Sequence, residues 1–185
     1  MPNKYTNPHI TLSFVSSIDG KITMGDNPKV EAWASKEDQI QFKKLVKNHS
    51  VIIIGSRTYE AIKKNLRHET GKLRIVMTSR PERYKKEEIP GRLEFTSKNP
   101  KQVINMLSKR GVKKVLLACG GVLAHAFLKA KLVNKFLLTL EPKLFGEGTP
   151  LLTPPLLNIS LQLKTIERLN KKGTLLLTYT IKGKK

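Results

Sequence analysis

Short, strongly apolar runs alternate along this chain with segments of helical apolar periodicity, and this alternation limits the possible folds more than any other feature. The run Val51–Ile54 consists of β-branched residues only and ends at Gly55. Such a run predicts a strand that is buried on both faces, as the strands of parallel sheets are. Sheets of this kind bind ligands at the carboxyl ends of their strands. The segments that directly follow the strands are therefore the first places to search for a site.

The same periodicities divide the rest of the chain. Strands are expected at 10–18, 51–54, 73–78, 93–95, 115–118 and 136–140, and a terminal antiparallel hairpin at 161–166 and 174–181. Helices are expected at 36–48, 58–64, 100–109 and 122–130. Strand–helix alternation followed by a hairpin predicts one α/β domain over residues 1–185. We expect a mostly parallel central sheet with helices on both faces and an antiparallel edge.

The formal net charge of +21, from 35 Lys and Arg against 14 Asp and Glu, makes a basic nucleic-acid-binding module the non-enzymatic alternative. The basic residues are spread over the whole chain, however, and no helix-turn-helix, RNP or zinc-finger pattern accompanies them. We therefore expect no nucleic-acid partner. A surface of this charge also attracts small anions, including a cofactor that carries several phosphates.

Cysteine usage and hydropathy exclude several other classes. Cys119 is the single cysteine, so neither an internal disulfide nor a Cys-rich metal site can form, and we expect no metal. No apolar run approaches the roughly 20 residues that span a bilayer, and residues 1–8 do not resemble a signal peptide. These features predict a cytoplasmic protein without a membrane partner.

Residues suited to binding phosphate follow three of the expected strands. Glycine permits close backbone approach, hydroxyls and N–H groups donate hydrogen bonds, and a guanidinium can bind a phosphate in a bidentate manner. Their occurrence at successive strand ends predicts a dinucleotide cofactor, although the GxGxxG fingerprint is absent. The expected cofactor-binding residues are Gly55, Ser56, Arg57, Thr58, Thr78, Ser79, Arg80, Gly120, Gly121 and Val122.

These segments resemble the dihydrofolate-reductase-like superfamily. Ile53–Ile62 is similar to the "MGRxTxESI" segment of dihydrofolate reductases, and Val76–Arg80 to their "xLSR" segment. Gly120-Gly121 resembles their paired glycines, and Phe136–Thr139 their "LYLT" strand. The resemblance extends from about residue 10 to residue 152, and it implies the fold, hydride transfer and NADPH as cofactor.

A spacing in the N-terminal half adds to this resemblance. In dihydrofolate reductases, a Trp in a mobile loop lies five residues before the active-site carboxylate, which opens a helix bearing an aromatic residue. Here Trp33, Asp38 and Phe42 have that spacing. The Leu-Pro that usually precedes the carboxylate is replaced by Lys36-Glu37, and the Tyr expected after the paired glycines is missing, with His125 nearby.

The reductases of riboflavin biosynthesis, which include the C-terminal domain of the deaminase-reductase, belong to the same superfamily. Ser16–Ile22 resembles their "SLDGKIA" opening, and residues 126–133 and 144–150 also resemble that branch. Their "DDPxLxxR" stretch, which helps to hold a ribose phosphate, is replaced by EAIKKNLRH at 60–68. That departure favours reduction of 7,8-dihydrofolate to tetrahydrofolate. Reduction of a pyrimidine ribosylamino phosphate is the alternative.

The resemblance implies roles for further residues. A carboxylate can hold the N–C–NH₂ edge of a pterin by two charge-assisted hydrogen bonds and can promote protonation of the ring. We expect catalytic roles for Asp38, Trp33 and Thr139. The substrate, a pterin or a pyrimidine, is expected to contact Phe42, Phe14, Val15 and Lys72. The dihydrofolate branch is commonly monomeric and the riboflavin branch dimeric, so a monomer and a homodimer both remain open.

Overall fold

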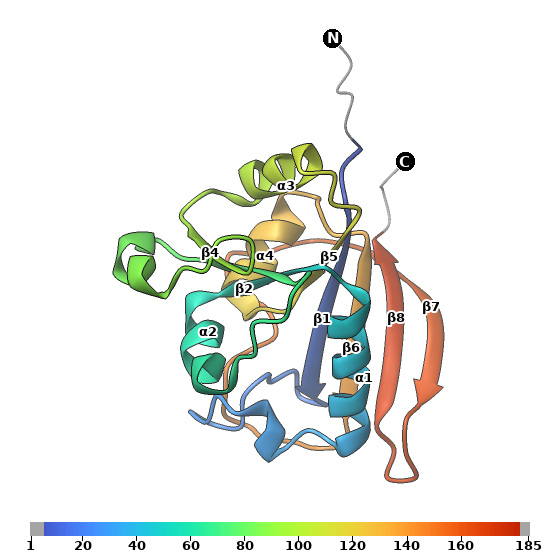
Figure 1. The fold of residues 1–185 in the computed structure, drawn as a ribbon. Helices are drawn as coiled ribbons and strands as arrows, with labels where there is room; N and C mark the ends of the chain where they lie inside the picture. Colours follow the sequence, from blue (N-terminus) through green and yellow to red (C-terminus); the bar gives the residue numbers. More distant parts are fainter. Residues whose placement is uncertain (1–5, 182–185) are drawn as a thin grey trace.

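The computed structural model describes residues 6–181, and an eight-stranded sheet forms its centre (Figure 1). The strand order is β4-β3-β2-β5-β1-β6-β8-β7. Strands β1 to β6 are mutually parallel, whereas β8 is antiparallel to both β6 and β7. The strands are β1 (His9–Ser17), β2 (Val51–Gly55), β3 (Leu73–Met77), β4 (Leu93–Thr96), β5 (Lys114–Leu117), β6 (Lys135–Glu141), β7 (Leu161–Arg168) and β8 (Leu175–Ile181). The predicted α/β class, with its parallel centre and antiparallel hairpin, is confirmed.

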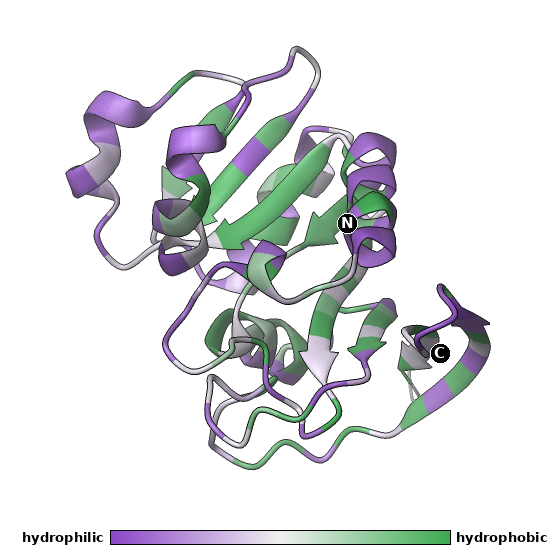
Figure 2. Ribbon diagram, turned by 90° about the horizontal axis from the view of Figure 1, so that it is seen from below, coloured by the Kyte–Doolittle hydropathy of each residue, from purple (hydrophilic) through white to green (hydrophobic). Residues whose placement is uncertain are grey.

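Helices cover both faces of the sheet. They are α1 (Lys36–Asn48), α2 (Ser56–Ile62), α3 (Pro100–Lys109) and α4 (Gly121–Lys129), with short 3₁₀ turns η1 (Val30–Ala32), η2 (Lys63–Asn65) and η3 (Pro81–Glu87). Alternate residues of β2 enter different cores, because neighbouring side chains of a strand point to opposite faces. Ile53 packs with residues of α3 and α4, whereas Ile52 and Ile54 pack on the α1 and α2 side. Figure 2 shows the hydrophobic strands between more hydrophilic helices.

Local sequence accounts for the helix starts. Helix α1 begins after Ser35, whose hydroxyl accepts a hydrogen bond from the backbone N–H of Asp38 at 3.2 Å. Helix α3 begins with a capping box formed by Asn99 and Gln102. The predicted helix 58–64 starts two residues earlier than expected, directly after Gly55, and its last residues form η2. Turns η1 and η3 were not predicted, because single 3₁₀ turns have little periodicity.

The parallel arrangement brings the carboxyl ends of β2, β3 and β5 together at one edge, as the sequence predicted. In Figure 1, β1 ends at the bottom near the N-terminal end of α1, and β2 ends farther to the left, where α2 begins. Within residues 6–181, no helix combines the length and apolarity that crossing a membrane requires. The same residues contain no group of three or more His, Cys, Asp and Glu arranged to hold a metal ion.

Candidate active site

The structure places Asp38 against the carboxyl end of the sheet. Asp38 lies in the first turn of α1 and is 7% exposed. Its carboxyl group is hydrogen-bonded to the side chain of Thr139 on β6. Thr139 is itself buried, between Val15 of β1 and Leu176 of β8 in the sheet register. Two of the predicted catalytic residues, 101 positions apart in sequence (139 − 38), are thus in contact.

The surroundings of Asp38 favour its protonated form. Burial raises the pKa of this carboxyl group from 3.8 to about 6. The hydrogen bond from Thr139 acts in the opposite direction, and the nearby negative charge of Glu141 raises the pKa further. Asp38 forms no salt bridge within the described residues. A carboxyl group with a pKa near 6 can carry a proton close to neutral pH and release it to a substrate.

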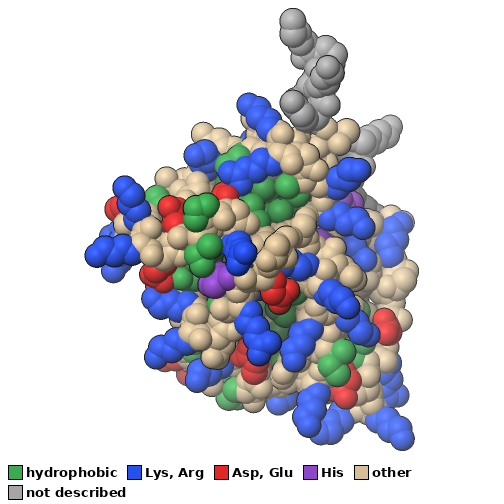
Figure 3. Space-filling view, in the orientation of Figure 1, with side chains coloured by type: hydrophobic (Ala, Val, Ile, Leu, Met, Phe, Trp, Pro, Cys, Tyr) green, Lys and Arg blue, Asp and Glu red, His purple; other side chains and the backbone are tan. Residues whose placement is uncertain are grey.

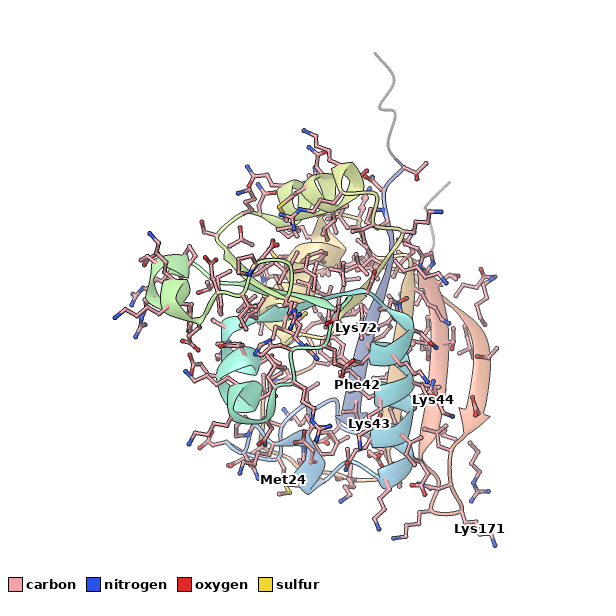
Figure 4. All side chains as sticks on the ribbon, viewed as in Figure 1. Met24, Phe42, Lys43, Lys44, Lys72 and Lys171 are labelled. Atoms are coloured by element: carbon pink, nitrogen blue, oxygen red, sulfur yellow. The ribbon has the colours of Figure 1, made fainter. Side chains whose placement is uncertain are left out.

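Aromatic side chains lie next to this carboxyl group in sequence. Trp33 is 3% exposed and packs edge-to-face on Phe145, with ring centroids 5.1 Å apart. Its indole N–H has no hydrogen-bond partner among residues 6–181. Phe42, one helical turn after Asp38, is 39% exposed, and Figure 4 shows it on α1. An exposed ring one turn from a buried carboxyl group fits the predicted substrate contact.

The structure places two of the predicted substrate contacts, Phe14 and Lys72, away from Asp38. Phe14 belongs to the core on the α3 and α4 side of the sheet, where its ring meets that of Phe136 at 6.2 Å. Thr139 contacts Asp38 of α1, and Val15 is the register partner of Thr139 on the neighbouring strand, so the Val15 side chain lies on the α1 side of the sheet. Successive residues of a strand alternate between faces, so the Phe14 side chain lies on the opposite side. Of Phe14 and Val15, only Val15 lies on the same face of the sheet as Thr139, and it stays a predicted substrate contact.

Lys72 is also misplaced by the sequence prediction, because it precedes β3 and lies at the amino edge of the sheet. Its ammonium group donates hydrogen bonds to the carbonyls of Val46, Lys47 and His49, at 2.6 to 2.8 Å. These carbonyls close the C-terminal end of α1, where a positive charge is favourable. Figure 4 shows Lys72 near that end of the helix, away from the loop that carries Met24.

The predicted cofactor-binding residues lie together at the carboxyl edge. Gly55 and Met77 are register partners on β2 and β3, so the segments 55–58 and 78–80 follow neighbouring strands. Gly120-Gly121 follows β5, the neighbour of β2 on its other side. The side chains of Arg57, Ser79 and Arg80 are exposed, and neither arginine forms a salt bridge within residues 6–181. These donors are free to bind an anionic ligand.

The paired glycines have different surroundings. A Cβ on Gly121 would lie 2.9 Å from the carbonyl oxygen of Leu151, so this glycine is needed where the segment 150–152 crosses the start of α4. A Cβ on Gly120 would meet nothing within 4 Å. Open space beside the backbone at a strand end is what close approach by a phosphate requires. Gly120, rather than Gly121, is the glycine whose surroundings suit a ligand.

Asp19, within the segment that resembles "SLDGKIA", holds two loops together. Its carboxylate accepts hydrogen bonds from the Ser17 hydroxyl at 2.6 Å and from the backbone N–H groups of Phe145 and Gly146 at 3.1 and 2.8 Å. The bond from Ser17, followed by those backbone bonds, lowers the pKa of Asp19 to about 2. Sequence reasoning gave this residue no role, because its partners lie 126 and 127 positions away.

The sequence analysis gave no role to two buried polar residues near the site. His125 lies one turn after Gly121 and is 7% exposed, and neither ring nitrogen has a hydrogen-bond partner within residues 6–181. Glu141 ends β6 and is 2% exposed. The alternation of Leu137, Thr139 and Glu141 along the strand was a signal for the second, since it places the glutamate on the same face as Thr139.

A sheet of this topology, with a buried carboxyl group and exposed hydrogen-bond donors at one edge, matches the expected superfamily. The model of the family described as "RibD C-terminal domain" matches residues 8–175, and the chain belongs to this family. Its structural neighbours are RibD-like pyrimidine reductases, which are part of the dihydrofolate-reductase-like superfamily. The resemblance stated from the sequence is thereby confirmed.

Individual relatives agree with this assignment. A curated relative, the uncharacterized protein YyaP of Bacillus subtilis (strain 168), is 26% identical over 159 residues, covering 82% of this chain and 84% of YyaP. A putative riboflavin biosynthesis protein from Shewanella sp. PV-4 superposes with a TM-score of 0.74 at 20% identity, covering 94% of this chain and 99% of that one. A pyrimidine reductase-like protein from Corynebacterium diphtheriae gives 0.73 at 15% identity, covering 94% and 92%.

A longer relative shows how this chain compares with a two-activity enzyme. The diaminohydroxyphosphoribosylaminopyrimidine deaminase/5-amino-6-(5-phosphoribosylamino)uracil reductase of Thermotoga maritima gives a TM-score of 0.74 at 15% identity. The match covers 95% of this chain but 57% of that chain. The similarity to these solved structures establishes the fold.

Proposed function

We propose that this protein is an NADPH-dependent reductase of a pyrimidine substrate of the riboflavin-pathway type, with Asp38 as its proton donor. Membership of the RibD C-terminal domain family supports an oxidoreductase, and it favours the pyrimidine alternative over dihydrofolate reduction. The observation that carries the mechanism is the buried Asp38 carboxyl group, hydrogen-bonded to Thr139 at the carboxyl edge of the sheet.

The residues around Asp38 suit a reduction that adds a hydride to carbon and a proton to a neighbouring heteroatom. NADPH, when bound, supplies the hydride. The protonated Asp38 carboxyl group donates its proton, directly or through a water molecule, and is left as a carboxylate that Thr139 stabilises by a hydrogen bond. The carboxylate can also hold the N–C–NH₂ edge of a 2-aminopyrimidine ring by two hydrogen bonds. Phe42 packs against the ring.

The segments after β2, β3 and β5 fit the cofactor. The exposed guanidinium groups of Arg57 and Arg80 and the hydroxyl groups of Thr78 and Ser79 are suited to phosphate oxygens. The free space beside Gly120 admits a phosphate close to the backbone. We propose that Arg80 binds the 2′-phosphate, so that NADPH is preferred to NADH. Arg80→Ala should weaken NADPH binding far more than NADH binding in a fluorescence titration, and equal weakening would contradict the assignment.

Dihydrofolate is the second candidate substrate. Its pterin carries the same N–C–NH₂ edge, and the spacing of Trp33, Asp38 and Phe42 resembles that of dihydrofolate reductases. In addition, residues 60–68 lack the "DDPxLxxR" stretch of the riboflavin enzymes. Oxidation of NADPH with dihydrofolate and with the ribosylamino phosphate in its diaminopyrimidine and aminouracil forms, assayed in parallel, separates the two candidates. Turnover of neither substrate would contradict both.

The role of Asp38 has its own test. Asp38→Asn keeps the size of the side chain but has no acidic proton, so we expect the hydride-transfer rate to fall about a hundredfold or more, the scale of a lost general acid. NADPH binding should not change. Asp26→Asn is the matched control, because Asp26 is an exposed aspartate to which no part in the reaction is assigned. Near-normal turnover by Asp38→Asn in stopped-flow experiments would refute the mechanism.

A further inference from the structure

The proposed reaction leaves one buried carboxylate next to Asp38 without a role. The two oxygens of Glu141 accept hydrogen bonds from separate parts of the chain, the backbone N–H of Ser35 and the hydroxyl of Thr174, each at 2.8 Å. Glu141 forms no salt bridge within the described residues. Burying a carboxylate without a cationic partner costs free energy unless hydrogen bonds compensate for its desolvation.

The hydrogen bond to Ser35 connects Glu141 to the start of α1. Ser35 is the N-cap residue, and its hydroxyl accepts the hydrogen bond from the backbone N–H of Asp38. Glu141 therefore holds the backbone of Ser35, and the Ser35 hydroxyl holds the backbone of Asp38. Two residues earlier on the same face of β6, Thr139 is hydrogen-bonded to the Asp38 carboxyl group. One strand thus fixes Asp38 at its backbone and at its side chain.

The turn between β7 and β8 supports the same arrangement from the other side. The Asn170 amide donates hydrogen bonds to the Thr174 hydroxyl at 2.9 Å and to the Glu37 carboxylate at 3.0 Å. Glu37 directly precedes Asp38, and Thr174 is 1% exposed. Glu141 thus accepts hydrogen bonds from two sides, the N-cap residue of α1 and the C-terminal hairpin.

We propose that Glu141 is a positioning residue for Asp38: its buried carboxylate joins the N-cap residue of α1 to the β7–β8 hairpin and so determines where the Asp38 carboxyl group lies. The inference rests on the proposed function for the use that Asp38 makes of this position. Glu141 also acts electrostatically, because its negative charge disfavours ionisation of Asp38 and keeps that group a proton donor at higher pH. The other charged groups near Asp38 are Glu37, Lys36 and Lys172. The hydrogen bond from Asn170 lowers the pKa of Glu37, and the charges of the two lysines lower it further.

Two substitutions separate the effects of position and charge. In Glu141→Gln, the amide oxygen still accepts from Ser35 and the amide N–H donates to Thr174, so the geometry is retained while the charge is lost. In Glu141→Ala, both hydrogen bonds are lost as well. Glu94→Gln is the matched control, because it neutralises a carboxylate that is bound to Arg110 at 2.9 Å on another part of the molecule.

The ligand-free protein offers a readout that does not depend on activity. Its aspartates are Asp19, Asp26 and Asp38, so ¹³C-labelled aspartate gives a spectrum that the Asp38→Asn variant assigns. We expect the Asp38 carboxyl signal to titrate near pH 6 in the unsubstituted protein. In Glu141→Gln its midpoint should fall by at least about half a pH unit, since a like charge is removed. In Glu141→Ala it should fall further toward 3.8, as Asp38 becomes more exposed.

Turnover provides the second readout. At pH 5.5, Glu141→Gln should retain its rate within about threefold, whereas Glu141→Ala should lose about tenfold or more in kcat without a change in NADPH affinity. A purely structural role predicts destabilised variants with an unaltered Asp38 titration, and that result would overturn the proposal. Failure of the unsubstituted protein to reduce either substrate would instead contradict the proposed function, while the titration still decides whether Glu141 acts on Asp38.

Discussion

At the scale of single residues, Asp38 shows how burial in one structure affects both chemistry and stability. Its pKa is about 6 in the folded protein against 3.8 for an ordinary aspartate, so the folded state binds its proton more tightly. The unfolding free energy therefore decreases as pH rises from about 4 to about 6, and the loss persists at higher pH. Burial of Asp38 thus lowers the stability of the folded state at neutral pH, which is the cost expected of a residue with the role proposed above.

Asp38→Asn should accordingly stabilise the protein at neutral pH while it slows hydride transfer. The gain should reach up to about 3 kcal/mol at pH 7.5, since each pKa unit corresponds to about 1.4 kcal/mol, and it should vanish near pH 4, where aspartate is protonated in the folded state. Urea unfolding at the two pH values measures the difference, with Asp26→Asn as the exposed control. A gain that does not depend on pH would show that the pKa of Asp38 is not raised in the folded protein.

Sequence reasoning reaches furthest at this scale where a position depends on local spacing. Asp38 and Phe42 were predicted to lie one turn apart on one helix, and both lie on α1, while their roles stay predictions. Phe14 was assigned to the wrong face, which the alternation along β1 decides. Lys72 was assigned across a loop, although a residue before a strand lies at the edge opposite the ligand. Glu141 was missed because its partner Ser35 lies 106 positions away.

At the scale of elements, the loops at the carboxyl edge are linked to each other. Residues 21–34, which include Gly25, Asp26, Asn27 and Pro28 and have little apolar content, are predicted from their composition to form a mobile lid that Trp33 reports on. In the structure, the first part of this segment pairs with residues 147–151: Ile22 donates to the Thr149 carbonyl, and Leu151 donates to the Gly20 carbonyl. Asp19 and the contact of Trp33 with Phe145 add to this connection. Mobility of the pair stays a prediction, and the two loops should move together.

Asp19→Ala should loosen both loops. It removes the acceptor for the N–H groups of Phe145 and Gly146, and Phe145 is the ring against which Trp33 packs. Because Trp33 is the single tryptophan, its emission should shift to longer wavelength, and limited proteolysis within residues 18–25 should accelerate. Asp26→Ala in the same loop should change neither property. An unchanged emission spectrum in Asp19→Ala would show that this carboxylate does not hold the loops.

The turn between β5 and α4 permits a paired test. Gly121→Ala places a Cβ against the backbone of residues 150–152 and should destabilise the fold by about 1–3 kcal/mol. Gly120→Ala meets no protein atom, so its stability should be nearly unchanged while its NADPH affinity falls at least severalfold. Urea unfolding and a cofactor fluorescence titration measure the two quantities. Unimpaired NADPH binding by Gly120→Ala would argue against a phosphate at this turn.

At the scale of the whole molecule, the +21 charge is distributed rather than concentrated. Figure 3 shows Lys and Arg side chains scattered over the visible face, with acidic side chains among them. A basic hollow at the amino edge, lined by Lys47, Lys72, Arg110, Lys113 and Lys114 among others, comes nearest to a polyanion site. Two of its cations are already engaged, since Lys72 donates to three carbonyls and Arg110 is paired with Glu94.

A distributed charge of this size should act on the cofactor through long-range attraction. Raising the salt concentration from about 0.01 M to about 0.1 M shortens the screening length from about 30 Å to about 10 Å, so the NADPH association rate constant should fall about three- to tenfold. NADH, which lacks the 2′-phosphate, should show a weaker dependence. Stopped-flow fluorescence measures both rates. A nucleic-acid-binding module predicts instead tight, steeply salt-dependent binding of duplex DNA without NADPH binding. That outcome would favour the nucleic-acid-binding alternative, against which the scattered distribution of the basic residues was the argument.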